Sequence, residues 1–371
     1  MKIALLEMYP GDPMATGERA RALTAFLSGR GHDVHTIGPS PDLLADFQRF
    51  RFSVWSRLKR RALGRRFLPH LWDYLADDLT PRIRAGAFDV VMGRLQPVAY
   101  ALTRLDDSVL KIFDTANIGF LETYHGWNAD LTEVELEYAK EMEIYRAADH
   151  VFLHHQLLAD FFRKHVYDDP KVQAVRMGSS PASGRAKHSA SPRLVYAGSY
   201  DYIQDPYLLS LLCGQSPYPI ECYGNKNPNF SFLPKPLDYR GFSAGTGFLQ
   251  DYQCGVITIS QDRLRRVSPS TKFAYYFANG LPVLFPEWME EGHTYEAAVP
   301  YTEATFAGQA RRVCEDPAGW QRLSDAALAA AATLTWDRVL QPIDDILTRW
   351  SERRASVARA NATVDRPMKN K

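Results

Sequence analysis

Residues 268–286 read SPSTKFAYYFANGLPVLFP, and this stretch indicates how the chain folds. Ser268 or Ser270 can cap a helix whose apolar residues recur at helical spacing, and Pro269 suits its first turn. A Gly-Leu-Pro turn then leads into a short apolar run that is typical of a buried strand. A helix followed directly by such a strand favours an α/β domain with a parallel sheet. Lys272 opposes the helix dipole, so we expect an anion nearby unless this lysine is simply a solvated surface residue.

The same pattern extends in both directions from this stretch. A polar segment rich in Ser, Ala and Pro, residues 179–192, predicts a linker between two doubly wound domains. We therefore expect an α/β fold with an N-terminal Rossmann-like domain at 1–178 and a C-terminal one at 193–335. Residues 336–350 predict a closing helix that could return to the first domain, and the polar tail 351–371 predicts disorder.

Composition restricts the class of protein. The 371 residues suffice for two domains at roughly 150 residues each, and 46% hydrophobic residues are typical of a globular chain. A formal net charge of +1 gives no global attraction for nucleic acid. Four widely spaced cysteines predict neither disulfides nor a zinc site, and no apolar run is long enough for a membrane span. We expect a cytoplasmic protein without a bound cofactor or metal.

Loops that follow strands are the first candidates for a binding site. Two facing doubly wound domains place the carboxyl ends of their strands around one cleft. Gly17 precedes the first predicted helix, while Gly198 and Ser199 follow the first strand of the second domain. Glycine lets the backbone approach a ligand, and free N–H groups at the helix start, with Ser270 and the Lys272 ammonium, would hold a phosphate or diphosphate. Plain turns explain the glycines equally well.

The stretch SPSTKFAYYFANGLPVL resembles the donor-site segment of two-domain GT-B glycosyltransferases, particularly the large retaining family four. The order of other segments is also similar, including GERARALTAFLSGRGHDVHTIG near the start, RAADHVFLHHQLLADFF and RLVYAGS. The resemblance covers about residues 1–350. It implies a GT-B enzyme that moves a sugar from a nucleotide diphosphate sugar to a hydroxyl acceptor and needs no metal.

The resemblance also suggests roles for particular residues. Gly17 matches a glycine near the sugar phosphate, Gly198 and Ser199 match the loop under the donor diphosphate, and Lys272 matches a lysine close to it. Tyr275 falls where the family usually has a glutamate that binds the ribose, and a phenol cannot replace both acceptor oxygens of a carboxylate. The family usually has arginines after the segment that matches 197–199, where they pair with the diphosphate, and this sequence lacks them. Arginines in the loop before residue 268, Arg266 among them, could supply this positive charge. Alternatively, they could be solvated surface residues.

A second subset, the inverting glucuronosyltransferases of xanthan-type polysaccharide synthesis, is similar over a shorter length and also lacks the glutamate. Inverting transfer needs a base in the first domain. Asp114 and His125 follow a predicted strand and are our candidates, although Asp114 could equally cap a loop. Glu18 and Arg94 are candidates for contacting acceptor or phosphate. An epimerase of the same architecture and a non-catalytic relative remain alternatives.

Residues 49–72, RFRFSVWSRLKRRALGRRFLPHLW, combine basic and aromatic side chains without an acidic one. This pattern is typical of a segment that rests on an anionic membrane surface, and a solvated helix face is the simpler interpretation. We therefore expect a nucleotide sugar and a hydroxyl acceptor as partners, with peripheral attachment to the membrane as a further expectation.

Overall fold

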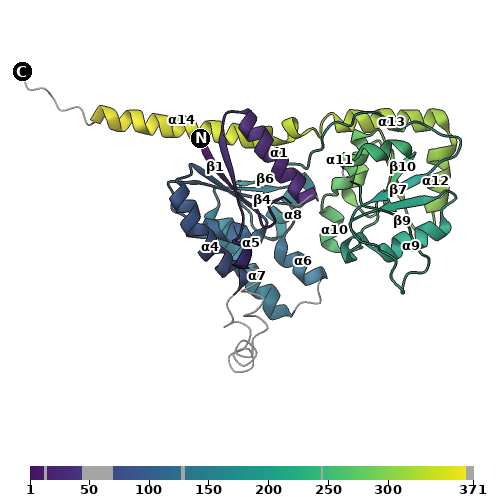
Figure 1. The fold of residues 1–371 in the computed structure, drawn as a ribbon, viewed down its shortest axis with the longest axis horizontal. Coiled ribbons are helices and arrows are strands. Elements are labelled where there is room, and N and C mark those ends of the chain that lie inside the picture. Colours follow the sequence, from purple (N-terminus) through teal and green to yellow (C-terminus); the bar gives the residue numbers. More distant parts are fainter. Residues whose placement is uncertain (12–14, 44–69, 127–129, 244, 365–371) are drawn as a thin grey trace, which may run out of the picture.

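The computed structural model describes residues 1–11, 15–43, 70–126, 130–243 and 245–364. Most of the basic segment 49–72 and the last part of the tail, 365–371, lie outside these ranges. Figure 1 shows two α/β domains joined along one side by the chain and by a long C-terminal helix.

The first domain is built on a six-stranded parallel sheet in the order β2-β1-β3-β4-β5-β6. Helices cover both faces of this sheet, and α1 and α4 precede and follow the outer strand β2. The strands are β1 (Lys2–Leu6), β2 (Asp33–Ile37), β3 (Val90–Arg94), β4 (Leu110–Thr115), β5 (His150–Leu153) and β6 (Val172–Ala174). The helices are α1 (Ala15–Gly29), α4 (Leu71–Gly86), α5 (Gln96–Ala99), α6 (Gly119–Gly126), α7 (Leu131–Ala147) and α8 (Gln156–His165).

The second domain repeats this plan with the strand order β12-β11-β10-β7-β8-β9. Its strands are β7 (Leu194–Ala197), β8 (Ile220–Tyr223), β9 (Asp238–Gly241), β10 (Cys254–Val256), β11 (Val283–Pro286) and β12 (Ala298–Tyr301). Its main helices are α9 (Pro206–Gln215), α10 (Arg263–Val267), α11 (Thr271–Ala278), α12 (Phe306–Glu315) and α13 (Pro317–Ala331). Short 3-10 helices lie at Tyr202–Gln204 and Glu290–Thr294.

The apolar runs predicted as strands are the centres of these sheets. β4 is buried at every position and β11 likewise, as expected for strands covered by helices on both faces. The helix, turn and strand predicted within 268–286 correspond to α11 and β11, and Gly280 adopts the positive φ of 70° that the turn between them requires. The predicted α/β fold with two Rossmann-like domains is confirmed.

The long helix α14 (Trp336–Val364) follows the second domain in sequence but packs on the first. Its side chains Leu340, Ile343 and Leu347 are buried in one apolar cluster with Ile3 and Leu23 of the first domain. The helix continues through residues 351–364, where we predicted disorder, so that prediction is wrong for these residues. Polar composition alone does not distinguish an exposed helix from a disordered tail.

The segment predicted as a linker, 179–192, has no regular secondary structure and runs between β6 and β7. Its first residue forms an isolated parallel bridge with Thr335, and the Ser179 N–H donates to the Leu334 carbonyl at 2.9 Å. Within the described ranges, no helix combines the length and the apolar character that crossing a bilayer requires.

Candidate functional site

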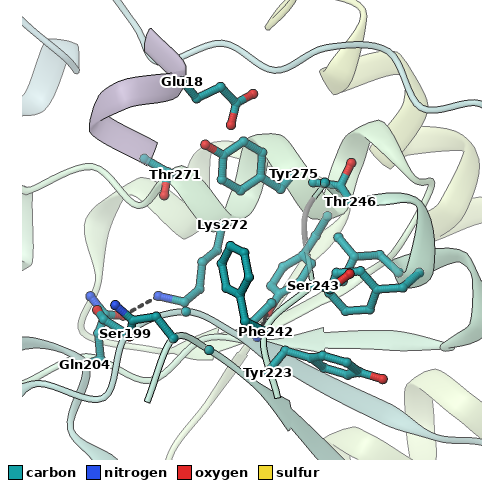
Figure 2. Close-up of a pocket in the computed structure, with 18 residues that line it drawn as sticks. Glu18, Ser199, Gln204, Tyr223, Phe242, Ser243, Thr246, Thr271, Lys272 and Tyr275 are labelled. Carbon is teal, nitrogen blue, oxygen red and sulfur yellow. Dashed lines mark hydrogen bonds between the residues drawn. The ribbon is translucent and has the colours of Figure 1, made fainter. Parts of the chain in front are cut away.

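A cavity of about 250 Å³ lies at the carboxyl ends of β7, β8 and β9. Its lining comes from residues 197–199, 223–225, 242–243, 245–246 and 248–249 of the second domain, together with one face of α11. Glu18 of α1 completes it from the first domain, so the cavity lies between the domains (Figure 2). This is the edge where open parallel sheets bind ligands.

Lys272 points into this cavity from the first turn of α11. Only 7% of its surface is exposed, and its ammonium donates a hydrogen bond to the Gln204 side chain (Figure 2). The ammonium also lies 5.3 Å from the centre of the Tyr196 ring. Burial lowers the pKa of Lys272 to about 8, because the charged form loses its hydration. An anion that binds beside this poorly hydrated ammonium would therefore be strongly attracted to it.

Gly198 is the reason Lys272 can occupy this position. A Cβ atom at residue 198 would lie 2.7 Å from Cε of Lys272 and 3.0 Å from its Nζ. The glycine therefore leaves room for the lysine directly over the loop after β7, beside Ser199. The predicted juxtaposition of Gly198, Ser199 and Lys272 is present in the structure.

The start of α11 differs from the expectation. The Ser270 side chain makes no capping hydrogen bond, and its N–H donates instead to Oε2 of Glu291 at 2.7 Å. Glu291 is buried, and its Oε1 lies 3.8 Å from Nε2 of His155 in the first domain. Burial raises the pKa of Glu291 to about 7. We expected the Ser270 N–H to donate to a phosphate, but it donates to a carboxyl group of the protein instead.

Tyr275 lies one turn after Lys272 and faces the same cavity. Its hydroxyl is buried and has no hydrogen-bond partner of ordinary geometry. The Glu18 carboxylate, which comes from α1 of the first domain, points toward this hydroxyl (Figure 2). Burial and the nearby Glu18 charge raise the pKa of Tyr275, so the phenol stays protonated and able to donate.

Asp114 is the second-to-last residue of β4 and does not line the cavity. Its two oxygens accept hydrogen bonds from Nε and Nη2 of Arg19 at 2.8 and 2.7 Å, and its side chain is 0% exposed. Arg94 lies 3.3 Å away and His154 3.2 Å away. Although burial alone would raise its pKa, Arg19 and His154 hold the pKa of Asp114 well below its usual range. These contacts argue against the predicted role as a base and favour a role in fixing α1 against the sheet.

The other predicted residues do not line this cavity. Gly17 lines a neighbouring cavity beside the loop after β1. Arg94 is buried, and its Nη1 is paired with Glu7 at 2.7 Å. His125 is exposed near the end of α6, and Arg266 is 64% exposed and paired with Glu290. Gly198, Ser199, Lys272, Tyr275 and Glu18 are therefore the predicted residues that the structure brings together.

Similarity to known proteins is visible in the fold and not in the sequence. No model of a protein family matches the chain, and no curated protein matches it. Among solved structures, sucrose-phosphate synthase from Thermosynechococcus elongatus is similar with a TM-score of 0.71 and 13% identity, over 95% of this chain and 99% of that one. Trehalose 6-phosphate synthase from Burkholderia multivorans gives 0.62 with 13% identity, over 96% and 99%. HepE from Anabaena in complex with UDP gives 0.61 with 13% identity, over 94% and 100%.

The fold is GT-B. All three solved structures are GT-B glycosyltransferases, and each is matched over nearly its whole length. The similarity does not distinguish family four from other GT-B families, so that part of the resemblance stays a prediction.

Several residues of the GT-B cavity were not predicted from the sequence. Gln204 comes from the loop after β7, Tyr223 ends β8, and Phe242 follows β9. The rule that ligands bind at the carboxyl ends of parallel strands could have indicated Tyr223 and Phe242, because Tyr223 ends β8 and Phe242 directly follows β9. Nothing in the sequence pairs Gln204 with Lys272.

No group of three or more His, Cys, Asp or Glu side chains in the described parts of the chain is arranged to hold a metal ion. Metal independence stays a prediction.

Proposed function

We propose that this chain is a glycosyltransferase that moves a sugar from a nucleotide diphosphate sugar to a hydroxyl acceptor. The observation that carries the proposal is the desolvated Lys272 ammonium, held over the Gly198–Ser199 loop in the cavity between the domains. Charge-assisted hydrogen bonds to a phosphate would restore the solvation that this ammonium has lost. The GT-B structures that share the fold include HepE bound to UDP and to UDP-glucose, which supports a nucleotide sugar as the ligand class here.

The rest of the cavity suits a nucleoside. Tyr223, Phe242 and Phe248 line it and offer aromatic surface for a base. Ser243 and Thr246 add hydroxyl groups to the lining (Figure 2). A few polar groups on a largely apolar wall are typical of small-molecule sites.

The acceptor is expected to enter from the first domain. Glu18 is the carboxylate that this domain contributes to the cavity lining, whereas Asp114 is enclosed by Arg19. His125 is accessible on α6 and stays a candidate for contact with the acceptor or for proton transfer. Closure of the two domains would exclude water that would otherwise hydrolyse the donor.

Replacement of Lys272 tests the proposal. Lys272→Met keeps the length of the buried stem and removes the charge. We expect about tenfold or greater loss of affinity for the preferred nucleoside diphosphate among UDP, GDP and ADP, measured by isothermal titration calorimetry. Wild-type affinity should also fall as pH rises above about 8, because free Lys272 then loses its proton, and the variant should lack this dependence.

Lys235→Met is the matched control, since Lys235 is exposed on the loop between β8 and β9 and is not among the residues that line the cavity. Undiminished nucleotide affinity in Lys272→Met would contradict the assigned role of Lys272. A mass-spectrometric screen for slow hydrolysis of each nucleotide sugar by the wild type would identify the donor. No hydrolysis and no transfer with any donor would contradict the proposed activity.

We also propose that residues 49–72 attach the enzyme to an anionic membrane surface, as their basic and aromatic composition suggests. At the described end of this segment, Trp72 is 5% exposed and packs in the core of the first domain, so attachment would involve the residues before it. Sedimentation with phosphatidylcholine vesicles, with and without phosphatidylglycerol, measures this. Equal binding to both kinds of vesicle would contradict an electrostatic attachment.

A further inference from the structure

The loop that joins β8 to β9 exposes two phenylalanines. Phe230 and Phe232 are 44% and 61% exposed, and neither lines the cavity between the domains. Their rings stack on each other, with centres 5.3 Å apart and planes inclined by 4°. Single exposed apolar side chains are common, whereas contiguous apolar surface is characteristic of interaction sites. The donor cavity gives this pair of rings no role.

The base of this loop is firmly held. Residues 225–237 cross between two parallel strands without the helix that usually makes such a connection. The Asn229 side chain accepts from the Leu237 N–H at 2.7 Å and donates to its carbonyl at 3.3 Å. The Lys235 N–H donates to Oγ of Ser210 in α9 at 2.9 Å, and this hydroxyl donates back to the Lys235 carbonyl at 2.6 Å. The loop also buries Leu237 in the core, so its two phenylalanines are left outside by a defined backbone.

The charges on the loop are of one sign. Lys226 and Lys235 are both exposed, and residues 225–237 contain no Asp or Glu. Asp238, the next residue, is paired with Arg240 at 2.8 Å. An anionic surface would therefore meet two ammonium groups beside two apolar rings, without repulsion from a carboxylate of the same loop.

A lipid bilayer with anionic headgroups suits this combination. Phenylalanine rings have no polar atom that needs a partner among acyl chains, and the long lysine side chains reach the phosphate level from beside them. A second copy of this chain suits it less well. Two such loops packed on each other would bring four lysines together, with no acidic residue in either loop to pair with them.

We propose that the loop 225–237 is a membrane anchor, in which its two phenylalanines insert among lipids and its two lysines meet anionic headgroups. This surface belongs to the second domain and is separate from the segment 49–72 of the first. The inference goes beyond the proposed function and does not depend on it. It implies that the second domain is held at a bilayer surface, where a lipid-linked acceptor would lie.

Sedimentation with phosphatidylcholine vesicles, with and without phosphatidylglycerol, measures the contribution of the loop. Phe230→Ser combined with Phe232→Ser should weaken binding to the anionic vesicles by about tenfold or more, because two rings lose their burial. Lys226→Gln combined with Lys235→Gln should weaken binding to the anionic vesicles by about tenfold and leave binding to the neutral ones unchanged. Tyr138→Ser is the matched control, since it removes a 43% exposed aromatic side chain from α7 and should bind as wild type.

Phe232→Trp reports on the loop itself. Its tryptophan emission should shift to shorter wavelength with anionic vesicles and should be quenched by brominated lipids, beyond the response of wild type. The segment 49–72 contains Trp55 in both proteins, so the difference between them comes from residue 232. Circular dichroism melting of each variant checks that the fold is retained.

Three results would overturn the proposal. They are a wild type that does not bind vesicles, a double phenylalanine variant that binds them as wild type does, and a Phe232→Trp emission that vesicles change no more than that of wild type. The affinity for nucleoside diphosphates without vesicles should be equal in wild type and the loop variants. A loss of this affinity in the phenylalanine variant would place the loop in the donor site instead, whereas the three results above leave the proposed sugar transfer intact.

Discussion

At the scale of single residues, Glu291 shows how burial changes the chemistry of a side chain. Its carboxyl group accepts the Ser270 N–H at the start of α11 and is 4% exposed. His155 and Arg176 face it from the first domain, and Tyr295 faces it from its own. Burial dominates over these neighbours and raises the pKa to about 7.

This pKa predicts a dependence of stability on pH. Between about pH 4.5 and 7 the folded protein keeps the Glu291 proton while the unfolded chain has lost it, so the contribution of Glu291 to the free energy of unfolding decreases as pH rises through this window. The total decrease is about 3 kcal/mol, at about 1.4 kcal/mol for each unit of pKa. Glu291→Gln retains an acceptor for Ser270 and does not titrate.

Urea unfolding of Glu291→Gln and wild type at pH 5 and pH 8 measures the effect. We expect the variant to gain about 3 kcal/mol relative to wild type across the window, while the exposed Glu303→Gln shows no such gain. Comparison at each pH largely cancels the titration of His155, whose pKa burial lowers to about 4. A difference between variant and wild type that is the same at both pH values would contradict the buried state of Glu291.

At the scale of elements, the loop after β7 and the helix α11 form one unit of the site. Gly198→Ala should push the Lys272 ammonium out of its position, because the added Cβ would lie 2.7 Å from Cε. We expect about tenfold weaker nucleotide binding with little change in the melting temperature, because the clash involves the mobile end of a side chain. Calorimetry and thermal melting give the two readouts.

Gly308→Ala is the control for that substitution. No heavy atom lies within 4 Å of a Cβ built at residue 308 of α12, so alanine should stabilise the helix by about 0.5–1 kcal/mol and leave binding unchanged. Equal nucleotide affinity in Gly198→Ala and wild type would show that Lys272 does not depend on this glycine.

The elements themselves were largely predictable from the sequence, and the contacts between them were not. The stretch 268–286 has local signals for a helix, a turn and a strand, and these formed as α11 and β11. The partner of Ser270, however, is 21 residues away, and that of Asp114 is 95 residues away in Arg19. A strand end predicts that Asp114 lies near the edge of a sheet, but only the packing of α1 determines that its oxygens are already occupied.

At the scale of the whole molecule, α14 makes the first domain depend on a segment that follows the second. Ile343→Ala should lower the free energy of unfolding of the first domain by about 2–5 kcal/mol, because this side chain is 0% exposed against the sheet. Val357→Ala, on the same helix but 59% exposed, should change it by less than about 0.5 kcal/mol. Urea denaturation followed by tryptophan fluorescence measures both, and similar values would show that α14 does not form part of this core.

The two domains also contact each other away from the chain connections. Nη2 of Arg265 in α10 donates to Oε1 of Glu122 in α6 at 2.7 Å, and both side chains are largely shielded from water. Arg176 at the end of the first sheet donates to the Tyr295 hydroxyl of the second domain. These contacts must break if the domains separate where they lie.

The chain crosses between the domains twice, and the two crossings are bonded to one another. Ser179 pairs with Thr335, and a Cβ at Gly178 would lie 2.7 Å from the Trp336 ring, so the segments are packed without space between them. A single connecting segment would let one domain rotate freely relative to the other. Two connecting segments that are bonded to each other resist this rotation and leave bending about one axis. Such bending would carry Glu18 away from Tyr275 while Lys272, Gly198 and Gln204 move together as one body. An open molecule would then keep the loop after β7 and α11 assembled, with Glu18 withdrawn from the cavity lining.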